Sequence, residues 1–309
     1  MATNFKIMRI LSSGLIFLLL LSSSCGPTEK KSEEQDFMEA LDAAPSNEPT
    51  ISEEVIGDIL QRIPSPLEIS VLLKESGRKY NSAFLNDPAN QPKYNTNYQR
   101  ALNLGVYGTD LGYTNIYEQN QDGLKYISAI KSLADGLNIG QFFDVETIGR
   151  LAANSKNLDS LLLITTQNFN SINTYLQNQN RANLSVLFLT GGWVEALHIT
   201  CGVAQNDPGN QQLRETIGGQ KIILENIMLL LSFYKDHDEN MAALLADLDG
   251  LKRAFDKVKI TYIYEESTFE VVDGVMVIKD NSSSTIDITP EDINSIRSLT
   301  DSLRKKIIS

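Results

Sequence analysis

From Ile51 to Val258, hydrophobic residues recur every three or four positions, which is the spacing of one face of an α-helix. One such stripe is formed by Leu124, Ile127, Ile130, Leu133, Ala134 and Leu137. Short stretches rich in Asn, Asp, Gly and Pro, which favour turns, separate the periodic segments. The pattern therefore predicts a mainly α protein with a multi-helix bundle over residues 51–257.

The pattern changes after Val258. The segments "KITYIYEE", "STFEVV" and "VMVIKD" are rich in β-branched and aromatic residues, and Asp273-Gly274 is a two-residue hairpin signal. Thr289 followed by Pro290 and two acidic residues then marks the start of a last helix. Residues 258–309 are predicted to form a small β-meander and a terminal helix, both packed on the bundle.

The stretch "ALNLGVYGTDLGY" (residues 101–113) has helical neighbours but contains Gly105, Gly108 and Gly112. At 100° per residue these glycines fall on one narrow arc of a helix. An arc without side chains lets another helix approach closely, and Gly191 and Gly192 offer the same feature in a second helix. We predict that these five glycines pack helices together; the alternative is a cleft in which a ligand lies against bare backbone.

The two glycine-bearing segments resemble each other across about 80 residues of sequence. Asn103-Leu104-Gly105-Val106 aligns with Asn183-Leu184-Ser185-Val186, and Gly112-Tyr113 aligns with Gly192-Trp193. Both follow an Asn-rich loop and precede another amphipathic helix. The bundle could therefore consist of two pseudo-repeated halves.

The N-terminal residues have the pattern of an export signal. Lys6 and Arg9 precede a short apolar run, Leu15–Leu21, which is too short to span a membrane, and small residues then precede Cys25. This arrangement resembles a bacterial lipoprotein signal, which implies cleavage before the cysteine and attachment of a lipid to its thiol. On this reading residues 1–24 are a signal peptide and Cys25 carries the covalent lipid; an ordinary cleaved signal is the alternative.

Residues 25–50 are polar, charged and interrupted by proline, so they are predicted to be a disordered tether. Within them "KKSEE" resembles the acidic export signals that follow the lipid-bearing cysteine in Bacteroidota surface lipoproteins. The expected location is the outer membrane, with the protein anchored by lipid and facing either the periplasm or the cell surface.

The body has a further resemblance. The segments "IPSPLEISVLLKESG", "ALNLGVYGTDLGY" and "GGWVEALHI" together resemble a group of Bacteroidota lipoproteins without an established activity, over residues 60–250. This resemblance implies a shared fold and origin but no mechanism.

Charge and cysteine content narrow the function classes. The formal net charge is −12 with a sequence pI near 4.7, and no basic stripe is present, which argues against nucleic-acid binding and against electrostatic adhesion to anionic lipid. Membrane contact is expected through the lipid anchor. Only one other cysteine, Cys201, is present, so lipidation of Cys25 leaves no pair for an intramolecular disulfide.

One constellation could carry chemistry. In "TGGWVEALHITC", Glu195 and His198 are three residues apart on an apolar helix face, which is how di-iron bundles present ligands. Together with Asp110 from the other glycine-bearing helix they form a candidate ligand or metal site. The alternative is a buried hydrogen bond between the acid and the imidazole. The chain has only two histidines and no recognisable catalytic motif, so no catalytic residue and no cofactor other than the lipid are assigned.

Two functions remain open. The first is a non-enzymatic envelope lipoprotein that binds a protein partner or a small molecule. The second is an envelope enzyme or metal-handling protein with a site between the two glycine-bearing helices, which requires Asp110, Glu195 and His198 to converge.

Overall fold

The computed structural model describes part of the chain, and all of the described residues belong to one compact unit, Ile51–Ser309. The described residues are 53–62, 73–74, 77–144, 146, 149–150, 153, 157–272, 275–279 and 281–309. The predicted signal peptide, Cys25 and the predicted tether lie outside these ranges.

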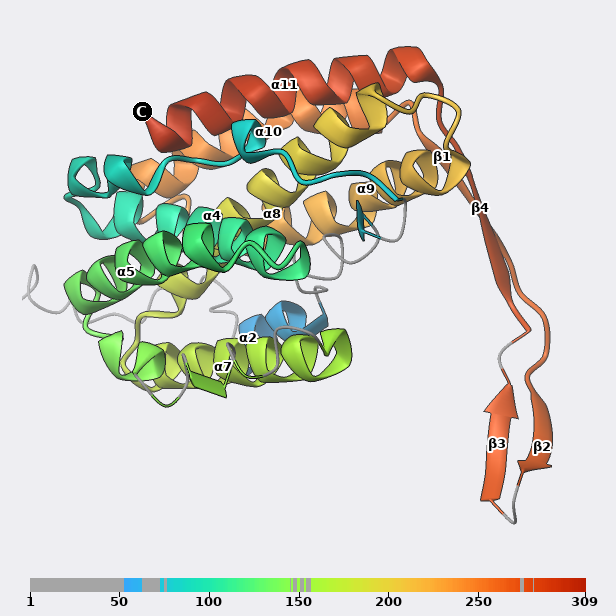
Figure 1. Cartoon of the computed structure of the whole chain (residues 1–309). Coiled ribbons are helices and arrows are strands. Elements are labelled where there is room, and N and C mark those ends of the chain that lie inside the picture. Colours follow the sequence, from blue (N-terminus) through green and yellow to red (C-terminus); the bar gives the residue numbers. More distant parts are fainter. Residues whose placement is uncertain are drawn as a thin grey trace, which may run out of the picture. The chain divides into compact units, whose positions relative to one another are not determined.

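The protein is mainly helical, with a small antiparallel β-structure and a C-terminal helix, as predicted (Figure 1). The α-helices are α2 (Glu53–Arg62), α4 (Asn97–Ile116), α5 (Asn120–Gly136), α7 (Leu158–Asn178), α8 (Ala182–Gln205), α9 (Gln211–Ser232), α10 (Glu239–Phe255) and α11 (Pro290–Ile308). Short 3-10 helices are η1 (Ser82–Phe84), η2 (Pro88–Lys93) and η3 (Gly140–Phe143).

Helix α8 is the centre of the bundle. It packs against α4, α7, α9 and α11, and Figure 1 shows it between α4 and α11. Among the described helices only α8 is long and apolar enough to cross a membrane, but 83% of its apolar window is buried inside the protein. A helix that is hydrophobic on all sides and covered by neighbouring helices is a core helix.

Local sequence explains where the outer helices begin. Thr96 and Gln99 form a reciprocal capping box at the start of α4, and Thr289 and Asp292 form another at the start of α11. Pro290 occupies the first turn of α11, where a missing N–H costs no hydrogen bond. Each cap satisfies backbone N–H groups that would otherwise lack partners.

The β-structure is one long two-stranded ribbon, which we define as Lys259–Asp287. Strand β1 (Lys259–Ile263) pairs with β4 (Ser283–Asp287), and β2 (Thr268–Val272) pairs with β3 (Val275–Lys279). Val272 is paired with Val275, and the predicted hairpin signal, Asp273-Gly274, lies outside the described residues.

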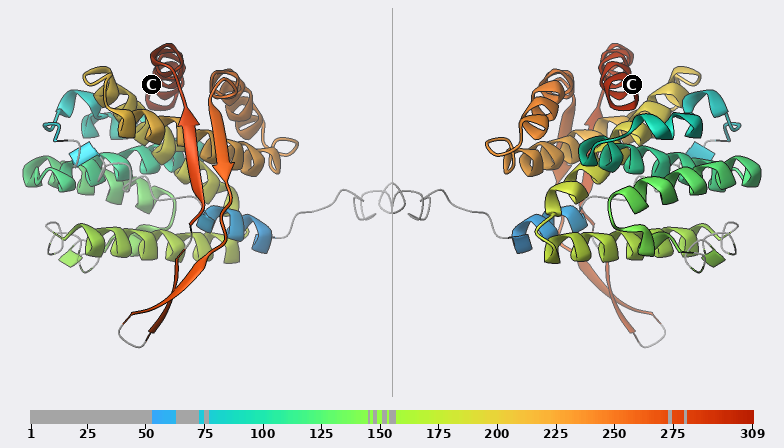
Figure 2. Two further views of the ribbon diagram at one scale, coloured as in Figure 1. Left: turned by 90° about the vertical axis from the view of Figure 1, so that its right-hand side faces the viewer. Right: turned by 90° about the vertical axis from the view of Figure 1, so that its left-hand side faces the viewer.

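The base of the ribbon contacts the bundle. Ile286 lies against Gly218 of α9, where an added Cβ would be 2.4 Å from the Ile286 side chain. Lys221 of α9 donates to the carbonyl of Val258 at 2.9 Å. Farther out, β2 and β3 lie well beyond the helices in Figure 1, and Figure 2 (left) shows the base of the ribbon between α10 and α11 and its far end below the helices.

Candidate functional site

The crossing of α4 and α8 sets the position of the candidate site. A Cβ added to Gly105 would lie 2.0 Å from the carbonyl oxygen of Phe188, and one added to Gly191 would lie 2.0 Å from that of Leu102. Backbone therefore meets backbone at both glycines, and no room is left there for a ligand. Gly108 differs, because its added Cβ would make only an ordinary contact, 3.8 Å from the Phe188 ring.

The two remaining glycines of the predicted set are also buried, Gly112 in α4 and Gly192 in α8. The amide nitrogen of Gly192 would be 2.6 Å from a Cβ at Gly105, and its carbonyl accepts a hydrogen bond from Thr109 Oγ1 at 3.0 Å. This close approach brings polar residues of α4 and α8 together next to the crossing.

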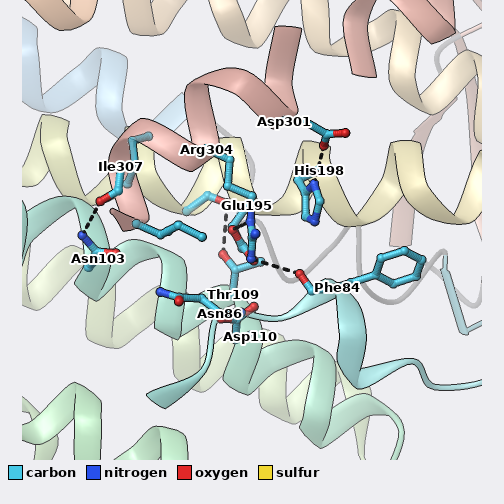
Figure 3. A network of polar contacts seen from close by, with 12 residues as sticks. Phe84, Asn86, Asn103, Thr109, Asp110, Glu195, His198, Asp301, Arg304 and Ile307 are labelled. Atoms are coloured by element: carbon cyan, nitrogen blue, oxygen red, sulfur yellow. Dashed lines mark hydrogen bonds and ion pairs between the residues drawn. The ribbon is translucent and has the colours of Figure 1, made fainter. Parts of the chain in front are cut away.

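Glu195 of α8 is completely buried and forms an ion pair with Arg304 of α11 (Figure 3). Arg304 Nε donates to one carboxylate oxygen at 2.6 Å, and Nη2 donates to the other at 2.7 Å. Nη2 also donates to the carbonyl of Phe84 at 3.0 Å. Burial opposes the charge on Arg304, but its hydrogen bonds and attraction to Glu195 raise its pKa further above the usual range. The pair joins α8, α11 and the segment before α4.

Asp110 of α4 is also completely buried and lies beside Glu195. Its Oδ2 accepts from the backbone N–H of Asn86 at 3.2 Å, while Oδ1 has no N–H or O–H donor. Burial, the negative charge of Glu195 and a hydrogen bond to Glu195 raise the pKa of Asp110 well above its ordinary value. The raised pKa favours the protonated carboxyl, so we assign Asp110 as the neutral acid of this pair.

Tyrosine hydroxyls hold Asn86 over the acid pair. Asn86 Nδ2 donates to the Tyr94 hydroxyl at 3.0 Å, and the Tyr126 hydroxyl donates to the Asn86 carbonyl at 3.0 Å. The Tyr107 hydroxyl donates to the carbonyl of Asp87 at 3.0 Å. Burial raises the pKa of all three tyrosines, which keeps them neutral hydrogen-bonding groups.

His198 does not join the acid pair. Its Nδ1 lies 2.6 Å from Asp301 Oδ1 on α11, and the ring of Phe84 packs edge-on against the imidazole at 6.3 Å between centroids. Asp301 is also 3.7 Å from Arg297 Nε. Of the three predicted site residues, the structure brings together Asp110 and Glu195, and it gives His198 a separate partner near the surface.

The site has few features of a metal centre. Among the described residues no group of three or more His, Cys, Asp or Glu side chains is placed to hold a metal ion. Both oxygens of Glu195 are already engaged by Arg304. Cys201, one turn beyond His198, is buried, and burial raises its thiol pKa, so its reactive thiolate form is disfavoured.

Sequence reasoning missed Arg304, Asn86 and Asp301. Arg304 is 109 residues from Glu195 along the chain, and Asn86 lies in a loop, so no local spacing connects them to the acids. The available signal was the position of Arg304 directly after Leu303, one of the buried residues of α11. An arginine bordering an apolar helix face needs an acidic partner when that face is covered.

No protein-family model, curated protein or solved structure matches this chain.

Proposed function

We propose that the protein is a lipid-anchored, non-enzymatic component of the cell envelope that binds a protein partner through the ribbon. The lipid on Cys25 would hold the chain at the outer membrane, facing the periplasm or the cell surface. The helical bundle would serve as the rigid body from which the ribbon extends.

The observation that carries this proposal is the exposure of large apolar side chains on the ribbon. The exposed fractions are 64% for Tyr262, 48% for Ile263, 72% for Tyr264, 67% for Phe269 and 67% for Met276. Each sheet in the described part of the ribbon has only two strands, so every strand has one edge without a partner strand. A lone two-stranded ribbon is only marginally stable in water, and an open edge is a template for pairing with another chain.

The buried acid pair supports a structural role rather than catalysis. Arg304 engages both carboxylate oxygens of Glu195, and at Gly105 and Gly191 the α4–α8 crossing is filled by backbone. Removing one partner of a buried ion pair strongly lowers the free energy of unfolding, so a pair of this kind stabilises the packing of the helices that it joins. These contacts favour the binding module over the alternative of an enzyme or metal-handling protein.

Cysteine accessibility in native envelopes tests the proposal. Tyr264→Cys would be compared with Leu124→Cys, which replaces a side chain on α5 that is 66% exposed. If a partner covers the ribbon, a maleimide should label Tyr264→Cys several-fold more slowly in envelopes than after dilution in detergent, with Leu124→Cys unchanged. Buried Cys201 contributes little background. Equal labelling of Tyr264→Cys in both states would refute a ribbon partner.

The anchor has its own test. The wild-type chain should incorporate a clickable palmitate analogue and sediment with membranes, whereas Cys25→Ser should do neither. Incorporation by Cys25→Ser at the wild-type level would show that Cys25 is not the modified residue. Protease treatment of intact cells would then separate a surface-facing protein, which is cleaved, from a periplasmic one.

A further inference from the structure

We propose that the partner of the ribbon is a second copy of this chain, joined edge to edge through β1 and the two residues after it. This inference rests on the proposed function, which requires the ribbon to be covered. The two β1 strands run antiparallel about a twofold axis at Tyr262, so that each residue opposes the residue at an equal distance on the other side. The product is a four-stranded antiparallel sheet shared by two chains.

Strand β1 is the edge available for this contact. Both strands contact the bundle at the base of the ribbon, β4 through Ile286 on α9 and β1 through Ile260. Within β1 only Ile260 is partly buried, and the other strand residues are exposed. The chain continues in extended contact with the opposite strand, because Ser282 Oγ donates to the Glu265 carbonyl at 3.3 Å. Strand β1 itself ends at Ile263, and this contact keeps Tyr264 and Glu265 beside the opposite strand, where the second copy would extend the pairing to residue 265.

Charge complementarity selects the register. With the axis at Tyr262, Lys259 opposes Glu265 of the second copy, and the twofold repeats this pair at the other end of the interface. Both side chains are exposed and can meet without desolvating a buried charge. Registers centred on Thr261 or Ile263 place Lys259 opposite Ile263 or Ser267 instead. Opposite charges facing each other across strands stabilise a sheet, so the Tyr262 register is favoured.

The apolar side chains of the edge match in the same register. Tyr262 opposes Tyr262 of the second copy, Ile260 opposes Tyr264, and Thr261 opposes Ile263. Aromatic and β-branched residues are the pairs that stabilise antiparallel strands. The contact covers the exposed rings of Tyr262 and Tyr264 and pairs the open backbone edge.

The predicted lipid anchor explains how two chains can form a dimer through so small an interface. Seven residues per chain bury less surface than a stable soluble dimer requires. Two copies held by lipid in one membrane meet at a high effective concentration, which strengthens a weak contact without adding interactions. The proposal therefore applies to the anchored chain, and the experiment uses it.

Disulfide trapping in envelopes tests the register directly. In Tyr262→Cys the two opposed Cα atoms would be about 4.5–5.5 Å apart, within disulfide range. In Tyr264→Cys the equivalent residues would be about 13 Å apart along the strands and beyond that range. Mild oxidation should give a covalent dimer of Tyr262→Cys at least tenfold more abundant than that of Tyr264→Cys. The wild-type chain, with Cys25 and buried Cys201, is the background control.

A charge swap provides the second variant. Added to Tyr262→Cys, Lys259→Glu should reduce the amount of covalent dimer several-fold, and Lys259→Glu combined with Glu265→Lys should restore it.

Equal trapping at positions 262 and 264, or no dimer at 262, would overturn the proposal. A dimer unaffected by Lys259→Glu would overturn the assigned charge pairing. Slow maleimide labelling of Tyr264→Cys without a Tyr262→Cys dimer would leave the proposed function intact with a different partner, whereas fast labelling would reject both.

Discussion

Replacing Gly105 by alanine should force α4 and α8 apart. The added Cβ would lie 2.0 Å from the Phe188 carbonyl oxygen, whereas C···O contacts begin near 3.3 Å, so the helices must separate by roughly 1.3 Å. Overpacking of this kind costs about 1–3 kcal/mol. The shift also loosens the hydrogen bond between Asp110 and Glu195, and an unsatisfied buried group costs about 1–3 kcal/mol.

Alanine at a helical position stabilises by about 1 kcal/mol relative to glycine, so Gly105→Ala should lower the free energy of unfolding by roughly 1–5 kcal/mol. Gly108→Ala is the matched control, because its Cβ meets only the Phe188 ring at 3.8 Å. It should leave the free energy of unfolding unchanged or raise it by up to about 1 kcal/mol.

Urea unfolding followed by tryptophan fluorescence measures both variants. Trp193 is the single tryptophan of the chain, is buried in α8 and donates to Gln220 Oε1 at 2.9 Å. Its emission therefore reports on the helix that the substitution displaces. Equal midpoints for Gly105→Ala and Gly108→Ala would refute the close-packed crossing.

Three further predictions concern the buried polar groups. The pKa of Asp110 is raised in the folded chain, so between a pH of about 3.9 and the folded pKa the folded state binds one proton more than the unfolded state. In that range the free energy of unfolding should decrease by about 1.4 kcal/mol for each unit that the pH rises. Asp110→Asn, which keeps a donor to Glu195, should remove this slope in urea midpoints compared from pH 4 to pH 8. Glu195→Ala should lower the free energy of unfolding by about 3–5 kcal/mol in the same assay, because it leaves Arg304 buried without its carboxylate. A loss below about 1 kcal/mol would contradict the structural role of the ion pair. Cys201 should resist alkylation until the chain unfolds, because it is buried and its thiol pKa is raised by burial, and rapid labelling of the folded protein would contradict this.

The fold was largely predictable because its signals are local. Hydrophobic spacing indicated the helices, and Thr289 with Pro290 marked the start of α11, where the structure has its capping box. The change to β-branched residues after Val258 located the strands. The pairing of β1 with β4 and of β2 with β3 depends on the whole length of the ribbon, so local sequence did not reveal that it extends beyond the helices.

The candidate site was predictable only in part. Periodicity placed Glu195 and His198 on one face of α8, but a shared face does not determine a shared partner. Arg304 of α11 takes Glu195, and Asp301 takes His198. These partners lie more than a hundred residues away along the chain, so only the tertiary packing of α11 could identify them.

The central claim is that the ribbon, and not the buried acid pair, makes the functional contact. The most direct test replaces residues 262–284 by Asn-Gly, which joins the paired Thr261 and Thr285 through a two-residue turn and keeps Ile260 and Ile286. The measurement is the apparent mass of the complex after mild solubilisation of native envelopes, with thermal unfolding as the control for folding. We predict an unchanged unfolding midpoint and a fall in mass to that of one chain. A complex of the shortened, folded protein that is still larger than one chain would contradict the account.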